Sequence, residues 1–186
     1  MLESTFMNPS PQPSAPDFNH LLLAELDALY RTARYLTGDP ALAEDIVQEV
    51  AVKAIRAKAT FRSEADFRPW IFTILRHTVS DHYRRQDAHP TPHSLEDDDL
   101  ELVAEETLDK NLFDHLLDEE VAQALAELPA EMRLAVLLAD VEEFSYRDMA
   151  EILGWPLGSV MSRLHRGRQK LRQLLLAYAK KKGYPA

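Results

Sequence analysis

The sequence predicts an all-α protein of two small helical domains joined by an acidic flexible linker. Apolar residues recur at intervals of three or four through most of the chain, and no segment of useful length alternates as a half-buried strand does. Proline, glycine and residues that favour helix N-caps separate the periodic segments. Residues 88–114 break the pattern with prolines followed by a run of acidic residues, and therefore divide the chain in two.

The first domain is expected at residues 18–87, after a disordered tail at residues 1–17 that is rich in Pro and Ser. Gly38-Asp39-Pro40 should end one helix and begin the next, because Gly favours a C-cap, Asp an N-cap and Pro the first helical turn. The apolar spacing predicts helices at residues 18–35, 41–59 and 67–85, with Ile46, Val50 and Ile55 facing inward and Pro69 in a first turn.

The second domain is expected at residues 115–180, followed by a basic tail at residues 181–186. A first helix should end before Pro129, which cannot continue it. A second, at residues 131–141, is apolar on several sides and is expected to be buried. The spacing predicts two further helices, at residues 145–153 and 159–179, on either side of a Gly- and Pro-containing turn.

Composition argues against several functions. The chain has no Cys, which excludes disulfides, Cys-ligated zinc and Cys nucleophiles. It has no Gly-rich phosphate loop or Ser nucleophile motif, and the His pairs 77/82 and 89/93 are weak metal candidates without Cys. We therefore predict no catalytic residues, no metal and no cofactor. No signal peptide or membrane-length apolar run is apparent, so we expect a cytoplasmic protein.

The net charge of −10 is distributed unevenly. Residues 96–120 contain twelve acidic residues and one Lys, so this segment carries −11 and the rest of the chain carries +1. From Arg163 to the C-terminus there are eight basic residues and no acidic one. Because a DNA duplex responds to local charge, the C-terminal domain remains a candidate for nucleic-acid binding.

The last two helices predict a helix-turn-helix. Ser145 occupies an N-cap position, Gly154 can adopt the left-handed conformation that ends the first helix, and Ser159 can cap the second. On the second helix an apolar stripe faces inward, and a polar set suited to a DNA major groove faces outward, namely Met161, Ser162, Arg163, His165, Arg166 and Lys170. The alternative is a basic surface helix that only packs on its neighbours.

The segment LAELPAEMRLAVLLADVEEFSYRDMAEILGWPLGSVMSRLHRGRQKLRQLL resembles region 4 of the extracytoplasmic-function (ECF) sigma factors of the sigma-70 family. The resemblance lies in the Leu-Pro before a buried helix, the aromatic-Ser-Tyr start, the Pro-x-Gly-Ser-Val turn and the Ser-Arg-Leu-His-Arg run. It implies that this domain reads the −35 promoter element, from Ser159 and the outward set above, and touches the polymerase flap. Trp155 stands where the family usually has a smaller apolar residue.

The segment LTGDPALAEDIVQEVAVKA resembles the polymerase-binding stretch of region 2 in the same family. The resemblance implies that Asp45, Gln48 and Glu49 face the clamp helices of the largest polymerase subunit. Spacings of three and four residues place these three side chains on one helix face. Without the resemblance, such a face would be read as ordinary solvated surface.

The segment FRPWIFTILRHTVSDHYRR resembles the helix of region 2 that melts the promoter and reads the −10 element. Aromatic side chains can stack on an unpaired base and Arg can hold the strand. The candidates are Phe61, Arg62, Phe67, Arg68, Arg76, His77, Arg84 and Arg85. Trp70 lies among apolar neighbours and is interpreted as a core residue, and the family usually has Asn where His77 stands.

Taken together, the resemblance implies a non-catalytic RNA polymerase sigma factor that directs promoter recognition, DNA melting and initiation. It further implies three partners: core RNA polymerase, promoter DNA as duplex and melted strand, and an anti-sigma factor, which can hold the protein at the membrane. Two other hypotheses are a helix-turn-helix regulator that acts without polymerase, which leaves residues 20–85 unexplained, and an enzyme, for which no motif is found.

Overall fold

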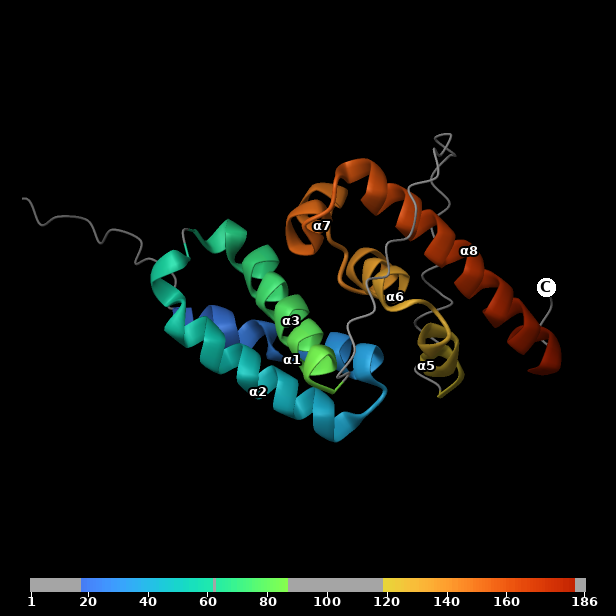
Figure 1. The fold of residues 1–186 in the computed structure, drawn as a ribbon, viewed down its shortest axis with the longest axis horizontal. Helices are drawn as coiled ribbons and strands as arrows, with labels where there is room; N and C mark the ends of the chain where they lie inside the picture. Colours follow the sequence, from blue (N-terminus) through green and yellow to red (C-terminus); the bar gives the residue numbers. More distant parts are fainter. Residues whose placement is uncertain (1–17, 62, 87–118, 183–186) are drawn as a thin grey trace, which may run out of the picture.

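The computed structural model describes residues 18–61, 63–86 and 119–182, and the regular structure in these ranges is entirely helical. The all-α prediction is therefore confirmed. The helices form an N-terminal module, residues 18–86, and a C-terminal module, residues 119–182, which pack against each other (Figure 1). The predicted tail, the predicted linker and Arg62 lie outside the described residues.

The N-terminal module contains three long helices and one short turn of 3₁₀-helix. These are α1 (Phe18–Thr37), α2 (Pro40–Arg56), η1 (Lys58–Thr60) and α3 (Glu64–Gln86). The joint between α1 and α2 is as predicted: Gly38 has φ +72° and the Asp39 carboxylate accepts a hydrogen bond from the backbone N–H of Ala41 at 2.9 Å. This cap fixes the angle at which α2 folds back along α1.

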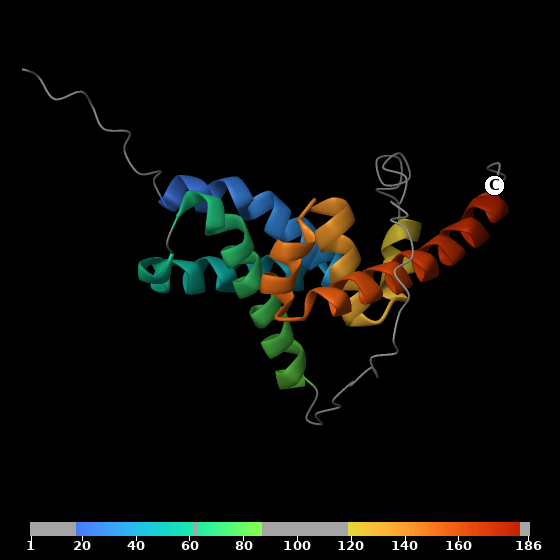
Figure 2. The same ribbon diagram turned by 90° about the horizontal axis from the view of Figure 1, so that it is seen from above.

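The C-terminal module contains four helices and one π turn. These are α5 (Glu119–Ala126), α6 (Ala130–Val136), η2 (Leu137–Val141), α7 (Tyr146–Leu153) and α8 (Leu157–Lys182). The predicted helix at residues 131–141 is thus an α-helix that widens into a π turn, and its buried character is confirmed by Val136, Leu137 and Leu138, each 0% exposed. Figures 1 and 2 show α8 extending away from the rest of the molecule.

Three local predictions are wrong. Helix α3 begins at Glu64, three residues before the predicted start at residue 67, so Pro69 lies beyond the first turn in which it was expected. Helix α8 begins at Leu157, so Ser159 is its third residue, and the first helical bond runs from Val160 N to the Pro156 carbonyl at 3.1 Å. Ile55, expected inward, is 57% exposed on α2. Apolar spacing identifies a helix more reliably than its ends or the orientation of one residue.

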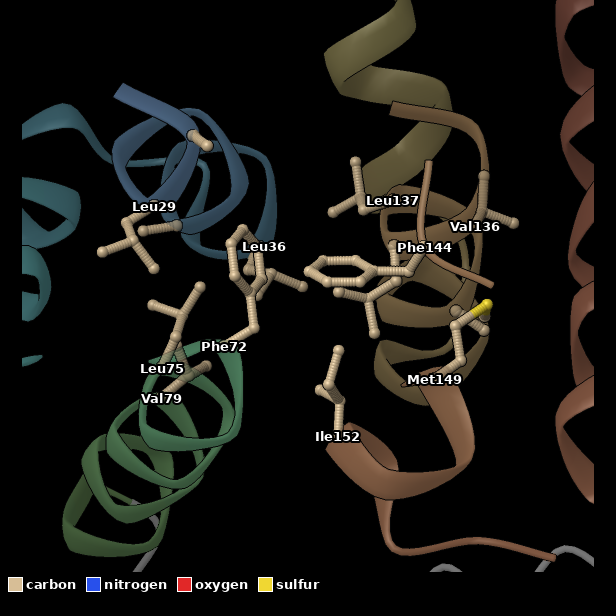
Figure 3. Packing of buried hydrophobic residues seen from close by; sticks show 14 of the residues in the cluster. Leu29, Leu36, Phe72, Leu75, Val79, Val136, Leu137, Phe144, Met149 and Ile152 are labelled. Atoms are coloured by element: carbon tan, nitrogen blue, oxygen red, sulfur yellow. The ribbon is translucent and has the colours of Figure 1, made fainter. Parts of the chain in front are cut away.

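The buried side chains form one continuous core that crosses from one module to the other. Leu29 and Leu75 fill the N-terminal side, and Leu137 and Met149 fill the C-terminal side (Figure 3). Between them, Phe72 of α3 and Phe144, which precedes α7, meet edge to face with ring centroids 4.9 Å apart. The modules therefore share an apolar contact in addition to their separate interiors.

Gly167 is the point of closest approach between α8 and α6. It lies in the inner stripe of α8 between Leu164 and Leu171, and a Cβ atom there would stand 2.9 Å from Val136 Cγ2 and 3.3 Å from the Met132 carbonyl oxygen. Since real Cβ atoms do not approach that closely, the two helices pack at this distance only because residue 167 has no side chain.

We predict that Gly167→Ala destabilises the protein by about 1–3 kcal/mol, because overpacking must push α8 away from α6. Gly158→Ala is the matched control: it lies in the same helix with no atom within 4 Å of the added Cβ, and should stabilise by about 0.5–1 kcal/mol. Urea unfolding followed by circular dichroism measures both. Equal effects of the two substitutions would contradict the close approach.

Candidate nucleic-acid interface

Helix α2 presents one exposed face that combines acidic, amide and apolar groups. Asp45 and Gln48 are exposed, and Val52 and Ile55 follow on the same face with exposed fractions of 46% and 57%. Glu49 is half-buried and forms an ion pair with Lys53 at 2.9 Å, one turn further along the helix. The predicted polymerase-binding residues therefore do share a face, and the structure adds two exposed aliphatic residues to it.

Aromatic residues from the start of α1, the segment before α3 and the first turns of α3 form a packed cluster. Phe18, Phe61, Phe67 and Trp70 lie with ring centroids 5.2–6.2 Å apart. Phe67 is only 2% exposed, so it cannot stack on an unpaired base in this arrangement, and we correct its interpretation to that of a core residue. Phe61 is half-buried at the edge of the cluster, and Trp70 packs against the core as predicted.

Arg68 and Arg76, predicted to hold a DNA strand, are occupied by the C-terminal module. Arg68 donates to the Glu142 carboxylate at 2.8 Å and to the Glu142 backbone carbonyl at 2.6 Å. Arg76 donates to the backbone carbonyl of Leu153, at the end of α7, at 2.9 Å. In this conformation neither guanidinium is free to bind a phosphate with all its donors.

His77 is exposed on α3 and lies beside Arg76, whose Nη2 is within hydrogen-bond reach of the His77 Nε2. Because Arg can only donate, neutral His77 must accept at Nε2 and carry its proton on Nδ1. Desolvation first, and then the positive charge of Arg76, hold the pKa of His77 below its ordinary value of 6.5. His77 is therefore largely neutral at physiological pH.

The last turns of α3 carry the remaining predicted strand-binding residues. Arg84 and Arg85 are both exposed, and Arg84 pairs with Asp81 one turn earlier. This hydrogen bond lowers the pKa of Asp81 below its usual value. The ion pair is solvent-exposed and therefore weak enough for a phosphate to compete for Arg84.

The predicted helix-turn-helix is confirmed in its geometry. The Ser145 hydroxyl accepts a hydrogen bond from the Asp148 backbone N–H at 3.2 Å, which caps α7, and Gly154 ends that helix with φ +66°. Most of the predicted outward set of α8 lies at least partly at the surface: Lys170 is exposed, whereas Met161, Ser162, His165 and Arg166 are half-exposed. The helix thus offers polar side chains along one side.

Arg163 departs from this set. Its side chain is only 13% exposed, its Nε lies 3.2 Å from the Glu131 carboxylate, and its guanidinium carbon sits 4.5 Å from the centre of the Trp155 ring. The guanidinium therefore ties α8 to α6 and to the turn rather than pointing outward, and we correct its interpretation to a structural role. This also explains Trp155, since a smaller apolar residue would offer no ring face to Arg163.

Sequence reasoning missed three residues that organise the structure. Glu142 is buried between the modules, and Arg133 donates both to the Leu36 carbonyl at the end of α1, at 2.8 Å, and to the Ala126 carbonyl at the end of α5, at 2.6 Å. Arg168 pairs with Asp140 at 2.6 Å. Periodicity gave no signal for these charges, because each has at least one partner that lies 28 or more positions away in sequence.

Within the described ranges, no group of three or more His, Cys, Asp or Glu side chains is placed to hold a metal ion. None of the helices in those same ranges combines the length and the apolarity required to cross a bilayer. His89 and His93 lie outside the described residues. What the structure does offer is two surfaces for macromolecules, the mixed face of α2 and the polar side of α8.

The fold and these surfaces define a two-module helical protein whose C-terminal module is a helix-turn-helix. Comparison with known families matches residues 21–89 to Sigma-70 region 2 and residues 118–171 to Sigma-70 region 4. The chain belongs to the ECF sigma factors of the sigma-70 family, which are non-catalytic subunits of RNA polymerase.

Two curated relatives illustrate the similarity. The chain is 32% identical to the ECF RNA polymerase sigma factor SigE of Mycolicibacterium smegmatis, over 90% of this chain and 65% of that protein. It is 33% identical to the ECF RNA polymerase sigma factor EcfG of Rhodopseudomonas palustris, over 83% of this chain and 82% of that protein. The chain thus spans just under two thirds of SigE and most of EcfG.

Two solved structures share the fold. The sigma factor RpoE of Bartonella quintana, in complex with the anti-sigma factor NepR, matches with a TM-score of 0.67 and 30% identity, over 86% of this chain and 96% of that one. CnrH in complex with the cytosolic domain of CnrY matches with a TM-score of 0.62 and 25% identity, over 86% of this chain and 88% of that one.

We predict that His77 titrates below pH 6.5 in the folded protein, and that Arg76→Gln raises this midpoint more than Arg84→Gln does, because Arg76 is the stronger coulombic cause. The unfolded chain binds the proton more tightly, so the contribution of His77 to stability is full above about pH 6.5 and is lost as the pH falls through the folded pKa. NMR titration of the His ring signals measures the midpoints; equal shifts in both variants would contradict the assignment.

Proposed function

We propose that this protein directs core RNA polymerase to promoters by binding the polymerase through α2 and promoter DNA through α3 and α8. The observation that carries the proposal is that one chain presents two separate, differently built surfaces. The α2 face is acidic and apolar, which suits a protein, whereas the outer side of α8 is basic and polar, which suits DNA.

The α2 face supports binding to a helical segment of the polymerase. Asp45, Gln48 and Glu49 offer charge and hydrogen bonds, and Val52 and Ile55 offer apolar area that is exposed in the free protein. Exposed aliphatic residues ringed by polar ones are typical of a protein interface, in which the apolar centre supplies most of the affinity. By family resemblance, the partner is the clamp-helix region of the largest subunit.

Melted DNA of the −10 element is proposed to follow α3. Arg84 and Arg85 are exposed, His77 is a neutral hydrogen-bonding group, and Phe61 lies at the edge of its cluster, near Arg62 in sequence. Arg68 and Arg76 join this set only when the C-terminal module releases them. Such a combination of arginines with an aromatic edge suits a single strand.

The −35 element is proposed to bind α8. Ser162, His165 and Arg166 occupy its first turns, where a recognition helix meets base edges, and Met161 and Lys170 flank them. Arg166 suits a guanine or a phosphate, and Lys170 suits a phosphate. Ser159, inside α8 rather than at its cap, is proposed only as a flanking contact.

The proposed function also implies where the protein acts and how it is controlled. We propose that the protein acts in the cytoplasm, where core polymerase and DNA are found, and that an anti-sigma factor controls it. The second point is supported by the similar sigma factor RpoE of Bartonella quintana, which was solved in complex with the anti-sigma factor NepR. Stress- or signal-responsive regulation is the expected consequence.

A regulator that binds DNA without polymerase is the alternative. It accounts for α7 and α8 but gives no role to the exposed apolar and acidic face of α2. We therefore expect the isolated protein to bind promoter DNA poorly, and tight site-specific binding without polymerase would favour the alternative.

Transcription in vitro tests the proposed function directly. Core RNA polymerase from a related bacterium is supplied with fragmented genomic DNA, with and without the protein. We predict discrete start sites that appear only with the protein, because core polymerase alone does not select promoters. Active core and folded protein that yield no new start sites would contradict the proposal.

Two substitutions separate the two surfaces. Arg166→Ala should weaken promoter binding by the assembled polymerase about 5- to 150-fold while core binding is unchanged, because one base-edge or phosphate contact is lost. Ile55→Glu should weaken core binding by about tenfold or more, because a charge enters an apolar contact. Leu23→Glu, at an apolar residue that is 67% exposed on α1, is the matched control. Loss of core binding in Arg166→Ala, or weaker promoter binding by polymerase that has been saturated with Ile55→Glu, would contradict this division.

A further inference from the structure

Four side chains of alternating charge form a row that crosses from α2 to α3, two helices that pack together (Figure 1). Glu49 and Lys53 lie one turn apart on α2, and Asp81 and Arg84 lie one turn apart on α3. The Lys53 ammonium stands 2.9 Å from a carboxylate oxygen of Glu49 and 3.6 Å from Oδ2 of Asp81. The other oxygen of Asp81, Oδ1, accepts a hydrogen bond from Arg84. The charge row Glu49, Lys53, Asp81, Arg84 is therefore continuous.

Lys53 is held at the middle of the charge row by a third contact. Its ammonium has three donors, and besides the two carboxylates it donates to the Thr78 hydroxyl at 3.1 Å. That hydroxyl in turn donates to the Ile74 carbonyl at 2.8 Å, and Thr78 is only 1% exposed. The hydroxyl is thus a fixed point on α3. The ammonium can shift from Glu49 toward Asp81 without leaving it.

Each inner member of the charge row is shared by two partners of opposite charge. Lys53 serves both acids, and Asp81 serves both cations. The hydrogen bond from Arg84, and also the charge of Lys53, hold the pKa of Asp81 below its usual value. Two cations at one carboxylate repel each other, so each is held less tightly than it would be alone. Strengthening one contact in the charge row therefore weakens the next.

The two ends of the charge row belong to the two proposed surfaces of the N-terminal module. Glu49 is a member of the proposed polymerase-binding face of α2, and Arg84 is a member of the proposed strand-binding set of α3. The Glu49 side chain is 37% exposed and that of Arg84 is 74% exposed. A cation of the polymerase can therefore compete with Lys53 for Glu49. In the same way, a DNA phosphate can compete with Asp81 for Arg84.

We propose that Lys53 is a positioning residue that couples polymerase binding to strand binding. When a basic group of the polymerase engages Glu49, Lys53 moves its charge to Asp81. Arg84 is then released to a phosphate of the melted strand. By linkage, a strand bound at Arg84 makes Glu49 more available to the polymerase by the same factor.

The expected coupling is modest, because all four side chains are partly exposed. Exposed ion pairs of this kind predict a factor of about two to five in affinity. The inference rests on the proposed function for the identity of the two ligands, although the charge row itself does not depend on it.

Strand binding by the isolated protein tests the charge row without polymerase. The probe is a short fluorescent oligothymidine at low salt, and its anisotropy gives the dissociation constant. Glu49→Gln imitates an engaged Glu49 and should tighten binding about two- to fivefold. Glu44→Gln, which removes an exposed acid of α2 outside the charge row, is the matched control for net charge. It should have a smaller effect, because no contact links Glu44 to α3 within the charge row.

The difference between these two variants should disappear when the charge row is cut. Lys53→Met keeps the apolar stem and removes the charge, and Thr78 retains its hydrogen bond to Ile74 in that background. Arg84→Gln cuts the charge row at its exposed end, so a folding defect in one background does not decide the result. Equal affinities of Glu49→Gln and Glu44→Gln, a difference that persists in Lys53→Met, or no oligothymidine binding by the wild type would overturn the coupling.

Core binding checks the opposite direction. Arg84→Gln leaves Asp81 to Lys53, so it should tighten binding to core polymerase about two- to fivefold, whereas Asp81→Asn leaves Lys53 to Glu49 and should weaken it by a similar factor. Both effects should vanish in the Lys53→Met background. Effects that persist there would come from long-range charge alone and would overturn the coupling. Failure of the wild type to bind core would instead refute the proposed function, and strand binding would then decide the charge row.

Discussion

A carboxylate can be buried only where positive charge and hydrogen-bond donors come with it, and Glu142 shows how one such requirement arranges a whole molecule. Its donors, Arg31, Thr32 and Arg68, come from two helices of the other module, so α1 and α3 must lie at fixed positions relative to residue 142. Breaking such a pair by removing one partner commonly costs about 3–5 kcal/mol. Phe72 and Phe144 then close the adjoining apolar gap, and α7 is brought against α3.

The two surfaces for macromolecules also result from which helix sides each module buries. Each module turns the apolar side of its helices inward and leaves one helix, α2 or α8, with a side that has no partner within the chain's described part. On α2 this side carries Val52 and Ile55, one and two turns beyond Gln48, and on α8 it carries His165 and Arg166. Arg163 is also a basic residue of α8, but it is enclosed by Trp155 and Glu131. It therefore holds α8 in position against α6 and the preceding turn and does not face outward.

The sequence predicted the helices and the turn chemistry because those are local properties: Asp39, Ser145 and Gly154 act on residues within three or four positions of themselves. It predicted the family and the helix-turn-helix for the same reason, since the motifs are contiguous. What escaped prediction depends on partners far along the chain. The burial of Phe67, the exposure of Ile55 and the enclosure of Glu142 are decided by packing between helices, which neither periodicity nor charge distribution contains.

The π turn η2 makes residues 137–143 a spacer of fixed length. Asp140, within the turn, forms an ion pair with Arg168 on α8, and Glu142, just after the turn, forms ion pairs with the other module. The next residue, Glu143, has a backbone φ of +56°, which residues other than Gly rarely adopt. In an α-helix successive residues are rotated by about 100° about the axis, so one residue inserted or deleted between Asp140 and Glu142 would turn one of the two acids away from its partner. The segment should therefore tolerate substitutions more readily than changes of length, so its length should vary less among related proteins than the identity of its residues.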